Sequence, residues 1–242
     1  MYSSFYTGAL GAKASLNKLD VVGNNLANIN NGGFKPKTAV FSDLIQYNLN
    51  DSEDAVTELQ AGAGVRTQNT YTTFAASTPV ASNSELDFAI MEDNSFFMVR
   101  DRGTNEVSYT RDGHFHRGQI GDRFYLMTDA GKLVLDRNKK PIVVEGRGAK
   151  DTPLLQQVGV YTFENPSRLM STSNNEYVPS EDTMRPSLVK NPELAQCALE
   201  SSGTDMSMEL TRMIESQRAY SYALKMVLTS DEIVGTINSL KG

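Results

Sequence analysis

Small and apolar residues recur at spacings of four and three near the start of the chain, a pattern typical of a helix that faces another helix. The positions are Phe5, Ala9, Ala12, Leu16, Leu19, Gly23 and Leu26. We expect Ser3 or Ser4 to cap the start of this helix. It should end at residues 30–33, where two glycines tolerate the left-handed conformation, and Pro36 prevents it from resuming.

The end of the chain repeats the pattern over residues 205–240, with Thr204 or Asp205 as the expected N-cap. Its seam comprises Met206, Leu210, Met213, Gln217, Tyr220, Leu224 and Val227, followed by Ile233, Ile237 and Leu240. This helix is about 54 Å long at about 1.5 Å per residue, whereas a compact body built from the middle of the chain is about 40 Å across. The seam therefore needs a partner outside that body, which is either the N-terminal helix or other copies.

The seam is a poor one for a stable pair of helices. Gln217 and Asp231 occupy positions that a two-helix coiled coil fills with Leu or Ile, and Ala9, Ala12 and Gly23 bury little area. We therefore hypothesise that the two helices pair weakly in the single chain and become ordered by packing among many copies.

The middle of the chain holds all eight prolines and consists of short alternating runs of β-branched and aromatic residues. These runs predict strands at residues 86–90, 96–99, 107–110, 124–128, 132–135, 142–145 and 158–163. Residues 111–113 and 129–131 each end in glycine and fit hairpin turns. The predicted fold is α+β, with long N- and C-terminal helices forming a coiled-coil-like core and a single antiparallel β domain in the middle. The expected boundaries are 1–35 and 204–242 for the helical core, and 36–203 for the β-rich domain with extended linking segments.

Composition narrows the class of protein. The 242 residues carry 23 Lys and Arg against 29 Asp and Glu, so the net charge is −6 and no basic cluster is present. We expect no nucleic-acid binding, because phosphates are met by clustered Lys and Arg. The single Cys197 excludes an intrachain disulfide and a cysteine zinc site. No apolar run is long enough to cross a membrane, and we expect no secretory signal peptide.

The best candidate for a chemical site is Asp112 with His114 and His116, since alternate residues of a strand share a face and these residue types bind metals. The group lacks a fourth ligand and adjoins an expected turn, so an exposed polar strand face is the preferred interpretation. No spacing of Ser, His and Asp indicates nucleophilic catalysis. We expect the protein not to be an enzyme and to bind no cofactor, metal or small-molecule substrate.

Residues 1–42 are net positive, because four lysines stand against Asp20 alone. These are Lys13, Lys18, Lys35 and Lys37. One interpretation is a solvated helix face. The other is that the lysines pair with acidic residues of a neighbouring copy and set the register of an assembly. The candidate acidic residues are Glu209, Glu215, Asp231 and Glu232.

Several segments resemble the bacterial flagellar rod and hook proteins. Residues 19–28 (LDVVGNNLAN) followed by 33–35 (GFK) resemble the N-terminal signature of that family, and residues 215–220 (ESQRAY) are similar to its C-terminal signature. Segments between them also resemble the family, at residues 39–44, 62–66, 96–99 and 109–113. The resemblance covers both ends and much of the middle of the chain.

The resemblance implies a structural subunit of the flagellar basal body that is exported through the flagellar type III apparatus. It implies self-association into a helical, torque-transmitting axial rod of the cell envelope, with other rod, hook and ring proteins as partners. The terminal helices are expected to form the inner core and the β domain an outer layer. The middle is too short for the additional domains of a hook protein, so a rod protein is favoured, and the distal rod over the proximal.

In the same way, the resemblance gives the helix residues packing roles. The expected assembly interface comprises Leu16, Leu19, Asn24, Asn25, Leu26, Asn28, Leu210, Met213, Gln217, Arg218, Tyr220 and Leu224. The apolar members are expected as inner helix contacts, and the polar ones to satisfy backbone or neighbouring groups. The alternative from a different class is a secreted β-domain binding module, for peptidoglycan or a ring protein, whose helices serve only as an oligomerisation stalk.

Overall fold

The computed structural model describes residues 2–44, 46–48, 60–146, 153–181 and 184–240. The chain divides into two compact units. The first, here called the helical unit, comprises Met1–Ala27, Lys37–Tyr71 and Asp205–Gly242. The second, here called the β unit, comprises Asn28–Pro36 and Thr72–Thr204. The α+β class expected from the sequence is confirmed, with a helix near each end and a mostly antiparallel sheet between them.

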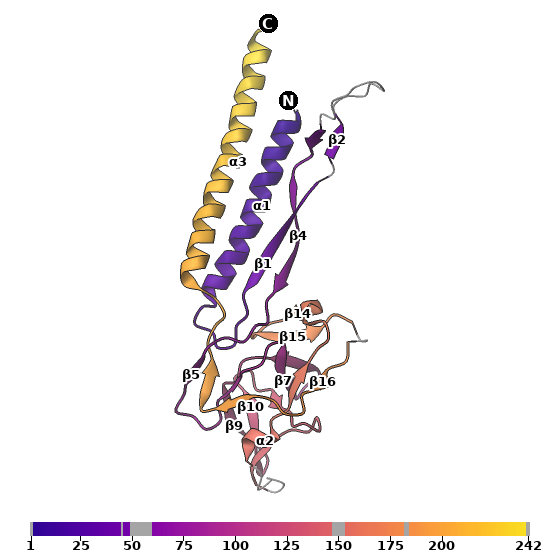
Figure 1. Cartoon of the computed structure of the whole chain (residues 1–242), viewed down its shortest axis with the longest axis vertical. Helices are drawn as coiled ribbons and strands as arrows, with labels where there is room; N and C mark the ends of the chain where they lie inside the picture. Colours follow the sequence, from indigo (N-terminus) through magenta and orange to yellow (C-terminus); the bar gives the residue numbers. More distant parts are fainter. Residues whose placement is uncertain (1, 45, 49–59, 147–152, 182–183, 241–242) are drawn as a thin grey trace. The chain divides into compact units, whose positions relative to one another are not determined.

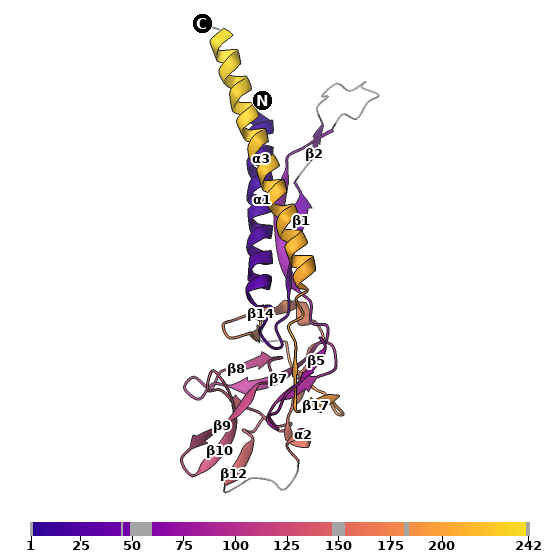
Figure 2. The ribbon, with the colours of Figure 1, turned by 90° about the vertical axis from the view of Figure 1, so that its left-hand side faces the viewer.

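The helical unit contains the two long helices, α1 (Tyr2–Ala27) and α3 (Met206–Leu240). They lie side by side in both views (Figure 1) (Figure 2). A pair of strands, β1 (Lys37–Asp43) and β4 (Val65–Thr72), lies along α1. Beyond it, β2 (Gln46–Asn48) pairs antiparallel with β3 (Gln60–Gly62). Neither α1 nor α3, over the part that the structure describes, has an apolar stretch long enough to cross a membrane.

The ends of the helices test the predicted caps. α3 is capped as expected by Asp205, whose Oδ1 accepts the Met208 N–H at 3.1 Å. The caps predicted for α1 are wrong, because the helix already begins at Tyr2 and so contains Ser3 and Ser4. α1 also ends before residues 30–33, at Ala27.

The sequence pattern predicts a β-rich domain that begins at residue 36, and the structure differs on this point. Residues Lys37–Tyr71 group with the helices, because β1 packs against α1 and pairs with β4. The strands of this segment are β1 to β4, and their polar sequences carry little of the alternation that marked the later strands.

The β unit is built around a ten-stranded sheet whose pairs are antiparallel. Its strands are β7 (Ser95–Arg100), β8 (Val107–Thr110), β9 (Phe115–Ile120), β10 (Arg123–Thr128), β11 (Leu133–Val134), β12 (Val143–Gly146), β13 (Val160–Thr162), β14 (Leu169–Ser171), β15 (Glu176–Pro179) and β16 (Ser187–Leu188). Two further pairs join β5 (Pro79–Ala81) to β18 (Ala198–Glu200) and β6 (Phe88–Ile90) to β17 (Leu194–Gln196). The short helices are α2 (Leu154–Gln157) and η1 (Pro166–Arg168).

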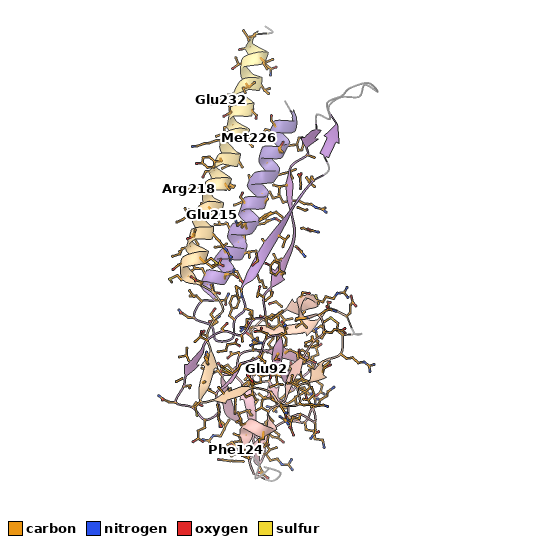
Figure 3. The ribbon with its side chains drawn as sticks, viewed as in Figure 1. Glu92, Phe124, Glu215, Arg218, Met226 and Glu232 are labelled. Carbon is orange, nitrogen blue, oxygen red and sulfur yellow. The ribbon has the colours of Figure 1, made fainter. Side chains whose placement is uncertain are left out.

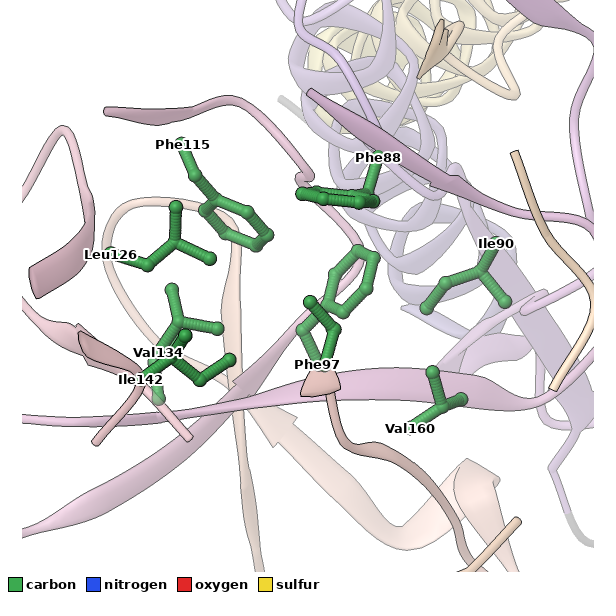
Figure 4. Close-up of a cluster of buried hydrophobic side chains, with 10 residues drawn as sticks. Phe88, Ile90, Phe97, Phe115, Leu126, Val134, Ile142 and Val160 are labelled. Carbon is green, nitrogen blue, oxygen red and sulfur yellow. The ribbon is translucent and has the colours of Figure 1, made fainter. Parts of the chain in front are cut away.

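β7 is buried on both faces, which explains its unbroken apolar run. Phe97 and Val99 belong to one buried cluster (Figure 4). Phe96 and Met98, on the opposite face, belong to a second, aromatic-rich cluster. Because successive residues of a strand point to opposite faces, β7 joins the two halves of the core.

All seven strands predicted for the middle are present, each within two residues of its expected ends. The hairpin predicted at residues 129–131 is confirmed, with Gly131 at φ +76° and β10 paired to β11. The hairpin predicted at residues 111–113 is wrong. β8 pairs with β7 and β15 while β9 pairs with β10, so the segment is a connection between strands that do not pair with each other.

Candidate assembly interface

α3 turns small and polar side chains toward α1. The Oγ atoms of Ser230 and Ser4 lie 3.4 Å apart. A Cβ placed on Gly8 would lie 3.0 Å from Val227 Cγ2, and one on Gly11 would lie 3.8 Å from the Ala223 Cβ. Residues without bulky side chains therefore allow the two helix backbones to approach closely along this line.

The buried residues of α3 are polar. They are Glu209, whose Oε1 accepts a 2.7 Å hydrogen bond from Arg212 Nη1, and Ser216. Twelve of its large apolar side chains are exposed instead. These are Met206, Met208, Leu210, Ile214, Tyr222, Leu224, Met226, Leu228, Ile233, Val234, Ile237 and Leu240. α3 is thus inside out: within the single chain it buries polar side chains and exposes apolar ones. Figure 3 shows the side chains of α3, with Met226 labelled.

The expected seam is therefore rotated in the structure. Met213 and Tyr220 are half-buried, but Leu210, Gln217 and Leu224 are exposed. Their expected places are taken by the preceding residues, Glu209, Ser216 and Ala223, which are more buried. Ser216 and Ala223 are small, which suits the close approach of the two helix backbones. Arg218 is also exposed.

On α1, the expected interface residues lie in different surroundings. Leu16 is exposed, and Leu19 and Leu26 are half-buried. Asn25 is fully buried and binds the backbone of Lys37 twice: its Nδ2 donates to the carbonyl at 2.8 Å, and its Oδ1 accepts the N–H at 2.9 Å. The Asn25 side chain therefore holds the first residue of β1 against the last turn of α1.

The remaining asparagines lie where α1 ends. Asn24 is exposed on the last turn. Asn28 belongs to the β unit. Its backbone carbonyl accepts a hydrogen bond from the Ser202 hydroxyl at 3.1 Å, and its Oδ1 accepts one from the Asn31 side-chain amide at 2.7 Å. The backbone of residues 28–31 is thus tied to the segment that precedes α3 in the chain.

The β unit contains a buried ionic cluster, here called the Glu200 cluster, formed by Lys35, Arg111 and Glu200. All three side chains have no exposed surface. Lys35 Nζ lies 2.6 Å from Glu200 Oε1, and Arg111 donates through Nε to Oε2 at 2.9 Å and through Nη2 to Oε1 at 3.0 Å. Ser77 N–H also donates to Oε1, at 2.7 Å.

Backbone carbonyls and the Ser77 hydroxyl, which accepts from Lys35 Nζ at 3.0 Å, satisfy remaining donors of the cluster. Arg111 Nη1 donates to the Ser95 carbonyl at 2.8 Å, and Lys35 Nζ to the Ala75 carbonyl at 2.5 Å. Burial lowers the pKa of the Lys35 amine, and the neighbouring Glu200 carboxylate opposes that shift. For Lys35, both predictions are wrong: the side chain has no exposed surface, so it is neither solvated nor available to an acidic residue of a neighbouring copy. Its partner is Glu200, on β18.

Gly33 fits against this cluster. It has φ +62°, and a Cβ there would lie 2.6 Å from the backbone carbonyl of Arg111. Its N–H donates to the Glu200 carbonyl at 2.8 Å. The Gly-Phe-Lys signature and Arg111 therefore meet in one place: the glycine allows close backbone contact and the lysine supplies charge. Sequence reasoning missed Glu200, although the motif character of residues 33–35 and 109–113 was the available signal.

The three residues considered as metal ligands do not converge. His114 Nδ1 lies 3.0 Å from Asp87 Oδ1, and His116 Nδ1 lies 3.4 Å from Asp129 Oδ1. Asp112 Oδ1 accepts the His114 N–H at 3.0 Å, and burial raises the pKa of this carboxyl. Both imidazoles are about half exposed. Within the described ranges, no three His, Cys, Asp or Glu residues are grouped as a metal site.

A helical unit whose own chain leaves its apolar surface uncovered is typical of subunits that complete their packing in an assembly. The profile described as "Flagella basal body rod protein" matches residues 5–35, and that described as "Flagellar basal body rod FlgEFG protein C-terminal" matches residues 195–240. The chain is 30% identical to flagellar basal-body rod protein FlgG of Buchnera aphidicola subsp. Schizaphis graminum, over 99% of this chain and all of the relative.

Two further relatives agree. FlgG of Bacillus subtilis is 29% identical over the full length of both chains, and rod protein FlgF of Mesorhizobium japonicum is 26% identical over 99% of both. The chain belongs to the flagellar basal-body rod protein family. It is a structural component of the rod, in the axial part of the bacterial flagellum, and the rod interpretation is supported over that of a binding module.

Proposed function

We propose that this chain polymerises helically through α1 and α3 into the torque-transmitting shaft of the rod, as a subunit of its distal part. In this proposal the two helices form a coiled-coil-like inner core and the β unit an outer layer. Export through the flagellar type III apparatus and contact with other rod, hook and ring proteins belong to the same proposal. Family membership and the full-length similarity to FlgG relatives support it.

The observation that carries the proposal is the inside-out character of α3. Twelve of the twenty large hydrophobic side chains exposed in the described part of the chain lie on α3, and three more lie on α1. Covering such side chains stabilises an assembly by about 25 cal/mol per Å² of apolar area. Many copies packed around a common axis would cover several faces of α3 at once.

From the expected interface set, the accessible residues are the proposed contacts between copies, namely Leu16, Asn24, Leu210, Gln217, Arg218 and Leu224. The half-buried Leu19, Leu26, Asn28, Met213 and Tyr220 border these contacts. Asn25 contributes indirectly, because its side chain holds β1 against α1 within the chain.

Replacing Leu224 tests the proposal. Leu224→Asp places a charge on the face that copies are expected to cover, so polymers should be lost while the β unit stays folded. Leu224→Met keeps an apolar side chain of similar volume and should polymerise. Electron microscopy and sedimentation measure assembly, swimming measures function, and near-UV circular dichroism reports on the aromatic core. Normal polymers and motility with Leu224→Asp would contradict the proposal.

A further inference from the structure

The end of α3 continues past the start of α1. Ser230 lies beside Ser4, near the beginning of α1, and α3 runs on to Leu240 (Figure 1) (Figure 2). These last residues, 231–240, are here called the tip, and all of them are exposed. Ten helical residues extend about 15 Å. The tip is therefore a helix segment that its own helical unit leaves uncovered.

The tip is both apolar and acidic. Ile233, Ile237 and Leu240 follow one another at spacings of four and three and so share a face, with Val234 beside them. Asp231 and Glu232 precede them, which gives the tip a net charge of −2. Glu232 is labelled on α3 in Figure 3. A partner for this segment must offer an apolar recess bordered by positive charge.

The helical unit holds such a recess, here called the groove. It has a volume of about 430 Å³ and lies between α1, α3 and the strands β1 and β4. The two helices line it with small side chains and Lys18, and the strands add the apolar side chains of Phe41 and Val65. Glu215 is its acidic lining residue. The charged residues of α1 together with those of residues 206–230 sum to +2, opposite to the tip.

Resting on the proposed function, we propose that the tip of one copy occupies the groove of a second copy, with Lys18 paired to Asp231 or Glu232. The apolar stripe from Ile233 to Leu240 and the α1 wall from Gly11 to Lys18 each cover seven residue-to-residue steps, about 10 Å. A tip cannot reach the groove of its own chain, because the tip and the lining residues Ala219 and Ala223 belong to one continuous helix. The occupant is therefore another copy.

Such a contact joins two different surfaces. Each copy offers a tip to one neighbour and a groove to another, so the arrangement does not close on itself as a symmetric dimer does. Contacts of this type generate open helical filaments. The proposal thus gives the assembly a direction, with the acidic tip of each copy bound in the groove of the next.

Charge exchange tests the pairing. Lys18→Glu and the double variant Asp231→Lys/Glu232→Lys should each lower the yield of polymer at least tenfold, and combining all three changes should restore most of it. Lys13→Glu, an exposed change on α1 outside the groove lining, should polymerise normally. Glu215→Gln should assemble at least as well as the parent chain, because it removes repulsion of the acidic tip.

The outcomes separate this inference from the proposed function. If the parent chain polymerises and the Asp231→Lys/Glu232→Lys chain does so equally well, or the combined variant shows no recovery, the tip does not bind the groove although the rod role stands. If the parent chain forms no polymer, the proposed function itself fails. As a second measurement, chains carrying Ile237→Cys and chains carrying Ala219→Cys, both with Cys197→Ser, should form disulfide-linked dimers when assembled together. Absence of that dimer in intact polymer overturns the contact.

Discussion

Arg111 and Glu200 form a two-point ion pair with no exposed surface on either side chain, although 89 residues separate them in the chain. Lys35, from the segment that follows α1, is a second cation bound to the Glu200 carboxylate. The segments that lead out of α1 and into α3 are therefore held together inside the β unit.

Breaking the Glu200 cluster should unfold the β unit readily. Glu200→Gln leaves two buried cations without their anion, which costs about 3–5 kcal/mol. The control is Arg168→Gln, which removes an ion pair that is more than half exposed on both sides and should cost less than about 1 kcal/mol. Urea unfolding followed by aromatic fluorescence measures both. Equal stability of the two variants would contradict a structural role for the cluster.

Gly33 should tolerate no side chain. Gly33→Ala combines a left-handed backbone with a contact of 2.6 Å to the Arg111 carbonyl. Gly121 has φ +61° but no atom within 4 Å of a Cβ, so Gly121→Ala isolates the backbone strain at about 1–2 kcal/mol. The Gly33 variant should lose clearly more than this in a thermal or urea unfolding experiment. A loss no larger than that of Gly121→Ala would show that the backbone relaxes freely there.

The Asn25 amide should hold β1 locally. Asn25→Ala leaves the N–H and carbonyl of Lys37 without that partner, at a cost of about 1–3 kcal/mol. Asn17→Ala, which removes one hydrogen bond to Thr67, is the control and should cost about 1 kcal/mol. Hydrogen exchange should accelerate at the Lys37 amide in the first variant only. Unchanged exchange at Lys37 would mean that strand pairing alone holds β1.

Two buried tyrosines should weaken the β unit at high pH. Burial raises the pKa of Tyr109 and of Tyr177 to about 12, from an ordinary 10.0. A pKa raised on folding stabilises the protein below pH 10 and loses that effect as pH rises toward 12. The free energy of unfolding should therefore fall between these values, together with a late rise in tyrosinate absorbance. With both tyrosines replaced by Phe, the loss of unfolding free energy over this pH range should be smaller. An unchanged loss would show that other groups cause it.

Close approach of the helices should depend on Gly8. Gly8→Leu inserts a side chain where even a Cβ lies 3.0 Å from Val227, so α1 and α3 should separate and amides of both helices should exchange faster in the polymer. Gly23→Ala is the control, because nothing lies within 4 Å of its Cβ and alanine favours helix by about 1 kcal/mol. Equal rates of amide exchange in the two variants would show that the contact between α1 and α3 does not depend on Gly8.

The features predicted from sequence were those encoded locally. Strand β7 and the helix cap Asp205 follow from alternation and capping chemistry within a few residues. The face that α3 turns toward its own chain could not be predicted this way, because Glu209 and Ser216 are buried while Leu224 is exposed. In the proposed assembly, neighbouring copies would bury the exposed apolar side chains, whereas contact with α1 decides what the single chain buries.

Long-range pairings were likewise beyond local patterns. Arg111 lies in a segment whose glycine and aspartate predicted a hairpin, yet its side chain is drawn inward by Glu200. β1 and β4 were missed because their alternation is weak, and their position follows from contact with α1. In both cases the deciding partner lies far away in the sequence.

The most direct test of assembly through the terminal helices is hydrogen exchange on the full-length chain, first dilute and then polymerised. We predict that amides of residues 2–27 and 206–240 exchange quickly in the dilute chain and become protected in the polymer, while the core strands of the β unit are protected in both. Helix amides equally protected in both states would contradict the account, because α1 and α3 would then be complete without their neighbours.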